Sequence, residues 1–397
     1  MQQGIPAKRA NRSFAPRPSP RRQQGAVTRG ATGLPGQGAA NDGVDRRMRA
    51  PYSAPASVRA PDRLPAGMAS APGMPRFTAR LVRAAGDLIA PRAKGAGRLC
   101  ILNYHRILAT PDHLIDSDPD IETFRWQMRL LAECFNVMPL HEAVETMASG
   151  RMPPRAVAIT FDDGYRSFHD LALPVLSEFN LPATVFVTTG HMDAHSSMWN
   201  DMILEAVRRL PPTSLDMRAF GLGELPLNGI EQRRRAAARL TDCCKYLSPL
   251  EREAFTTRLQ QLAGTALQQD LMLDADMLRT LTQHRIEIGG HTVSHPILTR
   301  LDDETARREI VDNKCQLEAI VGQPLRLFAY PNGKRSTDYT AAHVRMLEEA
   351  GYSAAFNTEI GAATRAHPRF ELPRACPWDP TPPMFAARLL RWLAGMI

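Results

Sequence analysis

The sequence lacks the features that mark several common classes of protein. Its 397 residues contain no apolar stretch of the roughly 20 residues that a membrane-spanning helix needs, and the first 25 contain no apolar core of a secretory signal. The six cysteines show no C-x-x-C spacing, which argues against a cysteine zinc knuckle or a disulfide framework and favours reduced thiols. There is also no G-x-x-x-x-G-K-[ST], G-x-S-x-G or H-E-x-x-H motif, and no G-x-G-x-x-G after a strand.

Most of the chain lacks an excess of positive charge, although the formal net charge of the whole chain is +8. Residues 1–98 hold 18 Lys/Arg and 4 Asp, whereas the other 299 residues hold 31 basic and 37 acidic side chains. The body of the protein is therefore mildly acidic, and no nucleic-acid partner is expected. Residues 1–75 are rich in Gly, Pro and Arg without apolar periodicity, which predicts a disordered leader unless Met68 or Met74 is the true start.

Amphipathic segments are predicted on either side of the folded part. Residues 76–98 read as a short basic helix followed by a linker, and residues 381–397 as a C-terminal helix of similar character. The two helices suggest peripheral membrane contact, although packing against the domain is the simpler interpretation. We expect a cytoplasmic protein or one peripheral at the membrane, and the sequence leaves its oligomeric state open.

Between these segments, short β-rich runs alternate with helical patterns. This order predicts parallel strands joined by right-handed crossovers, hence an α/β sheet or barrel over residues 99–380. A helix-rich block over about residues 198–284 interrupts the alternation and is expected to be an insertion on the rim. The predicted strands are Leu99–Tyr104, Ala156–Phe161, Ala183–Thr188, Ile286–His291, Arg326–Tyr330, Ala354–Thr358 and Phe370–Arg374.

Two motifs follow predicted strands and carry most of the chemistry. Asp162 and Asp163 come directly after an apolar strand and before a glycine turn, where parallel α/β folds build their active sites. A helix N-cap would explain one of these carboxylates but not the pair. His291 and His295 follow another strand with i, i+4 spacing, which is a common way to present two nitrogen ligands to one metal. With one Asp they would form a His₂-carboxylate set with open positions, as in catalytic sites.

Two weaker features also follow strands. Tyr330 and Pro331 lie in Phe-Ala-Tyr-Pro-Asn-Gly, a tight loop whose backbone N–H groups could face a pocket or simply connect a strand to a helix. Arg374 ends a late strand, where a guanidinium can orient a carboxylate.

These four features, in this order, resemble the polysaccharide deacetylase family (NodB homology, carbohydrate esterase family 4). The segments Asn103–Ile107 and Leu181–Val187 resemble its bacterial exopolysaccharide deacetylase branch. The resemblance implies a distorted (β/α)7 barrel that removes acetyl groups from N-acetylglucosamine-type sugars. Asp163, His291 and His295 would hold a divalent metal, usually zinc, although cobalt and nickel also suit such a set. Asp162 would be the general base.

The sequence departs from the family pattern at two points. The arginine that often steadies the base is absent from the Tyr330 segment, and Arg374 is the candidate to replace it. A late Leu-x-His segment is not recognisable, so His105 and His367 are candidate proton donors, with a structural role favoured for His367. We also predict substrate contacts from Tyr165, Tyr330, Pro331 and Trp199, although Trp199 and Trp378 could equally pack in the core or a lid.

Three functions remain open at this point. We favour a metal-dependent N-deacetylase acting on an exopolysaccharide or a glycan precursor. The same fold and metal could instead cut a C–N bond in a non-sugar amide. A non-catalytic glycan-binding or assembly protein is the third alternative, but it would have no chemical need for Asp162, Asp163, His291 and His295 together.

Overall fold

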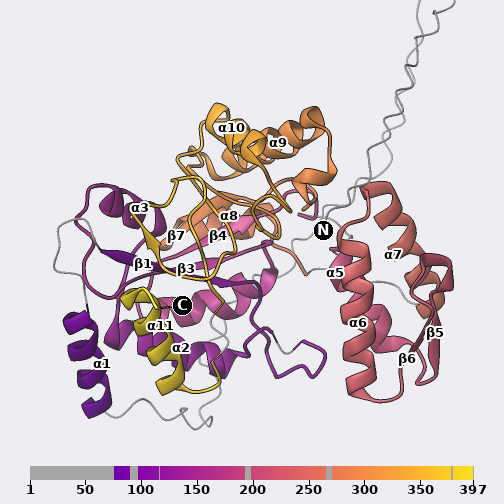
Figure 1. Ribbon diagram of the computed structural model, residues 1–397, viewed down its shortest axis with the longest axis horizontal. Helices are drawn as coiled ribbons and strands as arrows, with labels where there is room; N and C mark the ends of the chain where they lie inside the picture. The colour runs from indigo at the N-terminus through magenta and orange to yellow at the C-terminus, as the bar shows by residue number, and fades with distance from the viewer. Residues whose placement is uncertain are drawn as a thin grey trace, which may run out of the picture. The chain divides into compact units, whose positions relative to one another are not determined.

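The computed structural model describes residues 76–89, 97–115, 117–192, 198–264, 271–376 and 379–396. The leader predicted over residues 1–75 lies outside the described residues, as does Trp378. Figure 1 shows the arrangement of the helices and strands.

A curled parallel sheet forms the centre of the domain. Its six main strands pair in parallel in the order β1-β3-β4-β7-β8-β9, with β2 (Asn136–Val137) beside β3 and β10 (Ala363–Thr364) antiparallel to β1. Nearly every strand residue is buried, as expected for a parallel sheet covered on both faces. The main strands are β1 (Arg98–Tyr104), β3 (Ala156–Phe161), β4 (Ala183–Val187), β7 (Ile286–Gly290), β8 (Leu327–Ala329) and β9 (Ala354–Phe356).

The segment around Leu372 and Ala375 links the two edges of this sheet. The Leu372 N–H donates to the Ala355 carbonyl at 3.0 Å, and the Ala375 N–H donates to the Ile101 carbonyl at 2.9 Å. Both contacts are parallel bridges, one to β9 and one to β1. The segment lies where the seventh strand was predicted but forms only single bridges, and the predicted α/β fold of the distorted-barrel type is confirmed as a curled parallel sheet.

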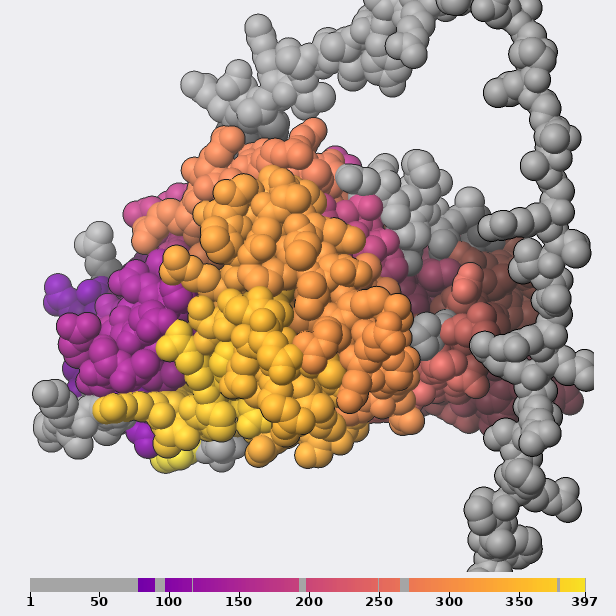
Figure 2. Space-filling view, turned by 90° about the horizontal axis from the view of Figure 1, so that it is seen from above, coloured from indigo at the N-terminus to yellow at the C-terminus, as the bar shows by residue number. Residues whose placement is uncertain are grey.

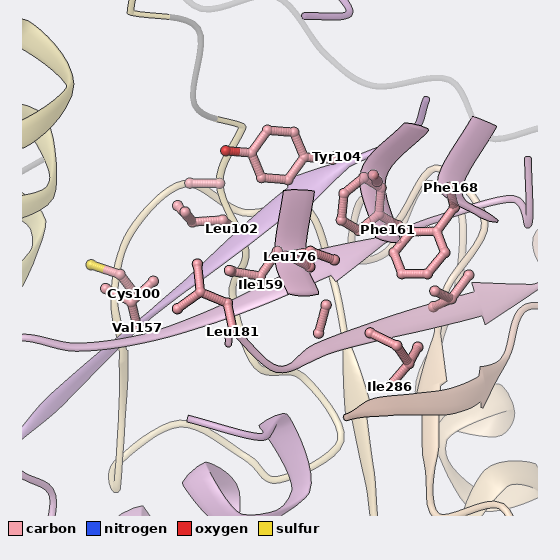
Figure 3. Close-up of a cluster of buried hydrophobic side chains, with 14 of the residues drawn as sticks. Cys100, Leu102, Tyr104, Val157, Ile159, Phe161, Phe168, Leu176, Leu181 and Ile286 are labelled. Atoms are coloured by element: carbon pink, nitrogen blue, oxygen red, sulfur yellow. The ribbon is translucent and has the colours of Figure 1, made fainter. Parts of the chain in front are cut away.

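Alternation along each strand divides the core into two layers. Figure 3 shows the outer layer, in which Leu102, Ile159 and Phe161 pack against residues of the covering helices. The inner layer combines small residues such as Ala156 and Ala158 with large ones such as Phe186 and Phe356, and α3 packs against it. Because successive side chains point to opposite faces, this register sends Asn103, Thr160 and Asp162 toward the inside.

The covering helices are α2 (Ile121–Cys134), α3 (Leu140–Ala148), α4 (Leu173–Glu178), α8 (Ala275–Thr282), α9 (Asp303–Val321) and α10 (Ala341–Glu349). On one face of the molecule the orange surface of α9 and α10 adjoins the yellow C-terminal residues (Figure 2).

The predicted insertion has a hydrophobic cluster of its own. It is built by α5 (Trp199–Arg209), α6 (Ile230–Lys245) and α7 (Pro249–Ala263) with the hairpin of β5 (Ser214–Asp216) and β6 (Glu224–Pro226), which are grouped together in Figure 1. Leu278 and Leu281 of α8 belong instead to the main core. The block with a separate core thus ends before α8, inside the range 198–284 expected from the sequence.

The two amphipathic helices, α1 (Arg76–Ile89) and α11 (Pro382–Ala394), pack against each other and against α2. The apolar face of α11, including Phe385, Leu389 and Trp392, is buried in the main core, whereas Leu81 and Leu88 of α1 are exposed. Within the described parts of the chain, no helix has both the length and the apolar character required to cross a bilayer.

Candidate metal centre and active site

The end of β3 places two carboxylates in different positions. Asp162 continues the strand, its N–H donating to the Tyr104 carbonyl of β1 at 2.9 Å, and its side chain points inward. Asp163 has a φ of 72°, a left-handed conformation that turns the chain before Gly164. Thr188, just after β4, donates from its hydroxyl to the Asp163 carbonyl at 2.9 Å and so fixes this turn. Both residues are 4% exposed.

Arg374 binds the carboxylate of Asp162 from the segment that links β9 to β1. Nη1 donates to Oδ1 and Nη2 to Oδ2, each at 2.7 Å, and Nη1 also reaches Asn103 and Thr160 at 3.3 and 3.2 Å. Burial alone would raise the pKa of Asp162, but the charges of Arg374 and His291 outweigh burial and lower it. Asp162 is therefore an ionised carboxylate with a fixed orientation.

Asp163, His291 and His295 come together at the same edge of the sheet. Oδ1 of Asp163 lies 3.4 Å from Nε2 of each histidine, and the three ligand atoms lie within 4.8 Å of one another. Nδ1 of His291 lies 2.7 Å from the Ala329 carbonyl; as the donor there, it leaves the Nε2 lone pair directed at Asp163. Burial lowers the pKa of His295 to about 3, so this ring is neutral. In His291 burial is outweighed by the hydrogen bond to Asp163 and by the charges of Asp162 and Asp163, which raise its pKa. Imidazole nitrogens and a carboxylate are the donors that zinc and similar divalent ions prefer, so the residues fit a metal.

The turn that carries the two histidines is held by α9. Glu309 accepts the N–H groups of Val293 and Ser294 at 2.8 and 2.9 Å. Asn313 is fully buried; its Oδ1 accepts the His291 N–H at 3.1 Å, and its Nδ2 donates to the Val187 and Thr292 carbonyls. The sequence analysis missed both side chains, because a helix pattern does not show which of its polar residues face a loop.

The start of α5 contacts the residues that follow β3. Asp201 accepts the Tyr165 hydroxyl at 3.1 Å and Nη1 of Arg106 at 2.9 Å, and Asn200 donates to the Tyr165 hydroxyl at 3.1 Å. Burial, although opposed by the Arg106 charge, raises the pKa of Asp201 to about 6. Tyr165 is 3% exposed. Tyr165, Arg106 and Asp201 line a cavity of about 420 Å³, and the metal ligands are not among its lining residues.

The other predicted site residues are placed as follows. Tyr330 is buried, stacks on Tyr339, and donates its hydroxyl to the Phe370 carbonyl at 3.0 Å. Its N–H donates to Phe356 within the sheet, so it is not free to bind a substrate oxygen, and the next residue, Pro331, is buried and has no N–H.

The remaining candidates lie on loops or on the insertion. His105 follows β1, and its charge contributes to the lowered pKa of both carboxylates after the larger effects of burial and nearer groups. Nδ1 of His367 accepts the Thr364 N–H at 3.0 Å in a turn, a structural contact. Trp199 packs against the cluster of the insertion, and its Nε1 is buried without a partner.

The structure thus defines a parallel α/β domain with a candidate metal centre, which is formed by a carboxylate and two histidines at the strand ends. Comparison with known proteins shows which family it matches. The family model described as polysaccharide deacetylase matches residues 149–218 and 244–355. These residues, just under half of the chain, match the polysaccharide deacetylase family, whose members are generally dependent on a divalent metal.

Several known proteins are similar to parts of the chain. Poly-beta-1,6-N-acetyl-D-glucosamine N-deacetylase of Staphylococcus epidermidis is 31% identical over 104 residues, which cover 23% of this chain and 36% of that protein. The protein of the same name from Staphylococcus aureus (strain MSSA476) is 30% identical over 115 residues, 26% of this chain and 40% of its own length. The chain thus matches well under half of each relative. Among solved structures, Streptococcus pyogenes deacetylase PplD in complex with acetate has 18% identity and a TM-score of 0.49, covering 75% of this chain and 99% of that one.

Proposed function

We propose that this protein is a metal-dependent hydrolase that removes N-acetyl groups from N-acetylglucosamine-type sugars of an exopolysaccharide or a glycan precursor. The observation that carries the proposal is the pairing of two functions at one sheet edge. Asp163, His291 and His295 form a set of candidate metal ligands. Asp162 lies beside them and forms an ion pair with Arg374. The names of the staphylococcal relatives support a glycan as the substrate.

Each residue has a distinct part in the proposed reaction. Asp163, His291 and His295 would hold the metal, for which zinc is the first candidate and cobalt and nickel are alternatives. The metal would supply Lewis-acid polarisation of the amide carbonyl and a more acidic water. Asp162 accepts the proton of the attacking water, and Arg374 keeps the carboxylate ionised and oriented. His105, after β1 at the same edge, is the candidate that returns a proton to the leaving amine.

The third function, glycan binding without turnover, is less well supported by the site. A binding protein needs a surface for sugars but has no use for a buried, ionised carboxylate beside three metal ligands. Asp162 and Arg374 are both nearly inaccessible to solvent, so they cannot serve as a broad sugar-binding surface.

The test is acetate release by the purified full-length chain from N-acetylglucosamine oligomers and acetylated polymers. We expect release with added zinc, cobalt or nickel and its loss with a chelator. A protein that is folded and loaded with metal but releases no acetate from any glycan would contradict the proposal. Hydrolysis of a non-sugar amide by the same preparation would then support the second alternative.

A further inference from the structure

Helix α1 is apolar on two sides, and only one of them packs against the domain. The packed side carries Ala79 and Gly86, both buried, where the helix contacts α2 and α11. Leu81 and Leu88 lie on another side of the helix and are 52% and 69% exposed. Because they are seven residues apart, they fall on one stripe of the helix surface, with the exposed Ala84 between them. This exposed stripe, defined by Leu81, Ala84 and Leu88, is left open to solvent.

Small residues on the packed side fix the rotation of α1 about its axis. A Cβ atom at Gly86 would clash with the side chain of Arg155 and would lie 3.2 Å from Cδ2 of Leu390 in α11, so the close approach depends on glycine. The Ala79 carbonyl accepts the thiol of Cys134 in α2 at 3.9 Å. The exposed stripe therefore faces away from the domain. Since α11 buries its own apolar face in the main core, α1 is the helix with an apolar face to offer a partner.

Positive charge accompanies the exposed stripe. Arg80 and Arg83 are exposed on the same helix and form no ion pair with any residue that the structure describes. The single acidic residue of α1, Asp87, is neutralised by Arg155, whose Nε donates to Oδ1 at 2.8 Å. The sequence before the helix adds to this charge, because residues 1–75 contain 12 Lys/Arg and 3 Asp. The partner of the stripe is thus expected to be apolar within and negatively charged at its surface.

We propose that α1 is an anchor that lies in the surface of a membrane containing anionic lipid. The acyl boundary of such a membrane would take up the leucines, while the lipid phosphates attract the arginines beside them. Two leucines alone give weak, reversible binding, and the basic residues supply the second attraction that a stable contact needs. The 14 residues of α1 are too few to cross a bilayer, so the helix would lie along the interface. This inference goes beyond the proposed function and does not depend on it.

The test is sedimentation of the full-length chain with two kinds of vesicle, one of phosphatidylcholine mixed with phosphatidylglycerol and one of phosphatidylcholine alone. We expect the wild type to bind the anionic vesicles about tenfold more tightly or better, and less tightly as the salt concentration rises. Leu81→Gln/Leu88→Gln removes the apolar side chains without changing the charge and should weaken binding to the anionic vesicles about 10- to 100-fold. Leu250→Gln/Ile360→Gln is the matched control, because both residues are exposed elsewhere on the domain, and it should bind as the wild type does.

Each alternative explanation gives a different result. If Leu81→Gln/Leu88→Gln keeps the thermal midpoint and the vesicle affinity of the wild type, the basic residues alone account for binding and the proposal is overturned. Equal binding to the two kinds of vesicle, or no binding to either, would also overturn it. A wild type that ignores vesicles but self-associates through the exposed stripe, as loss of association in Leu81→Gln/Leu88→Gln would show, would assign the stripe to a second copy of the chain instead. None of these measurements uses acetate release, so they leave the proposed function to its own test.

Discussion

Arg374 holds both carboxylate oxygens of Asp162, with two N–O distances of 2.7 Å and a guanidinium that is almost inaccessible to solvent. Burial raises the pKa of Asp162, but the charge of Arg374 lowers it by more, so the pKa lies below its ordinary value. A carboxylate of this kind is ionised above its pKa, and a reaction that needs it as a base fails as the pH falls through that pKa.

Replacing Arg374 should therefore change the pH profile as well as the rate. In Arg374→Met, burial is no longer opposed by the guanidinium, so the pKa of Asp162 rises and the acid limb of kcat/KM moves to higher pH. Arg374→Lys keeps the charge but loses the paired contact, so its shift should be smaller. Arg374→Met should also lose about 3–5 kcal/mol of unfolding free energy near neutral pH. An acid limb that is the same in all three proteins would show that Arg374 does not set this pKa.

Asp162→Asn separates proton transfer from metal binding. The amide cannot accept a proton, so we expect kcat to fall by about 10²- to 10⁴-fold while the metal content stays that of the wild type. Metal analysis and the thermal midpoint of the same preparation serve as controls, because the substitution also leaves Arg374 without a counter-charge. Wild-type turnover in this variant would remove Asp162 from the mechanism.

His295→Ala removes a proposed metal ligand. We expect the affinity for zinc to fall by about 100-fold or more, since even residues that only orient a ligand cost about 10- to 100-fold. Direct titration of the metal-free protein measures this without reference to activity. His284→Ala, an exposed histidine after α8, is the control and should bind metal as the wild type does. Retained tight, stoichiometric metal in His295→Ala would contradict the ligand assignment.

The parts of the fold that could be predicted from sequence are those with a local signal. Strand β3 matches its prediction because an apolar run ends abruptly at Asp162, and the site ligands follow strands that could be recognised in the same way. The segment at Leu372 was predicted as a strand, but its contacts are single bridges to β9 and β1, because it closes a curled sheet over a short distance.

The contacts that orient the site could not be predicted in this way. Asn313 lies within a helix whose sequence shows only a polar face. Its partners are 21 or more residues away along the chain. Tyr330 illustrates a different difficulty. Its place at the end of a strand suggested a contact with the substrate, but its ring is buried and stacks on Tyr339.

Asn313 offers a test of how the histidine turn is held. Asn313→Ala leaves the His291 N–H and the Val187 and Thr292 carbonyls without this partner, so we expect a loss of about 1–3 kcal/mol of unfolding free energy. Metal affinity should fall by about tenfold as His291 is less well oriented. Asp312→Ala, on the exposed side of the same helix, is the control. An Asn313→Ala protein with unchanged metal affinity would limit this residue to stability alone.

Asp201 links the insertion to the residues after β3, and its titration should be visible in stability. Because its pKa is raised from 3.8 to about 6, mainly by burial, the folded protein holds this proton more tightly than the unfolded chain. The resulting stabilisation is complete below the ordinary pKa and is lost as the pH rises through about 6. Asp201→Asn does not titrate. Urea unfolding should therefore show the wild type losing about 3 kcal/mol relative to the variant between a pH below the ordinary pKa of 3.8 and neutral pH.

The sign of this effect separates Asp201 from an ordinary ion pair. Asp112 pairs with Arg208, whose hydrogen bonds and charge outweigh the partial burial of Asp112 and lower its pKa. The stabilisation from Asp112 is present above its ordinary pKa and is lost as the pH falls, so Asp112→Asn should show the opposite trend. A wild-type-to-Asp201→Asn difference that is flat, or that follows the Asp112 trend, would contradict the raised pKa. It would then show that Arg106 and Tyr165 keep Asp201 ionised despite its burial.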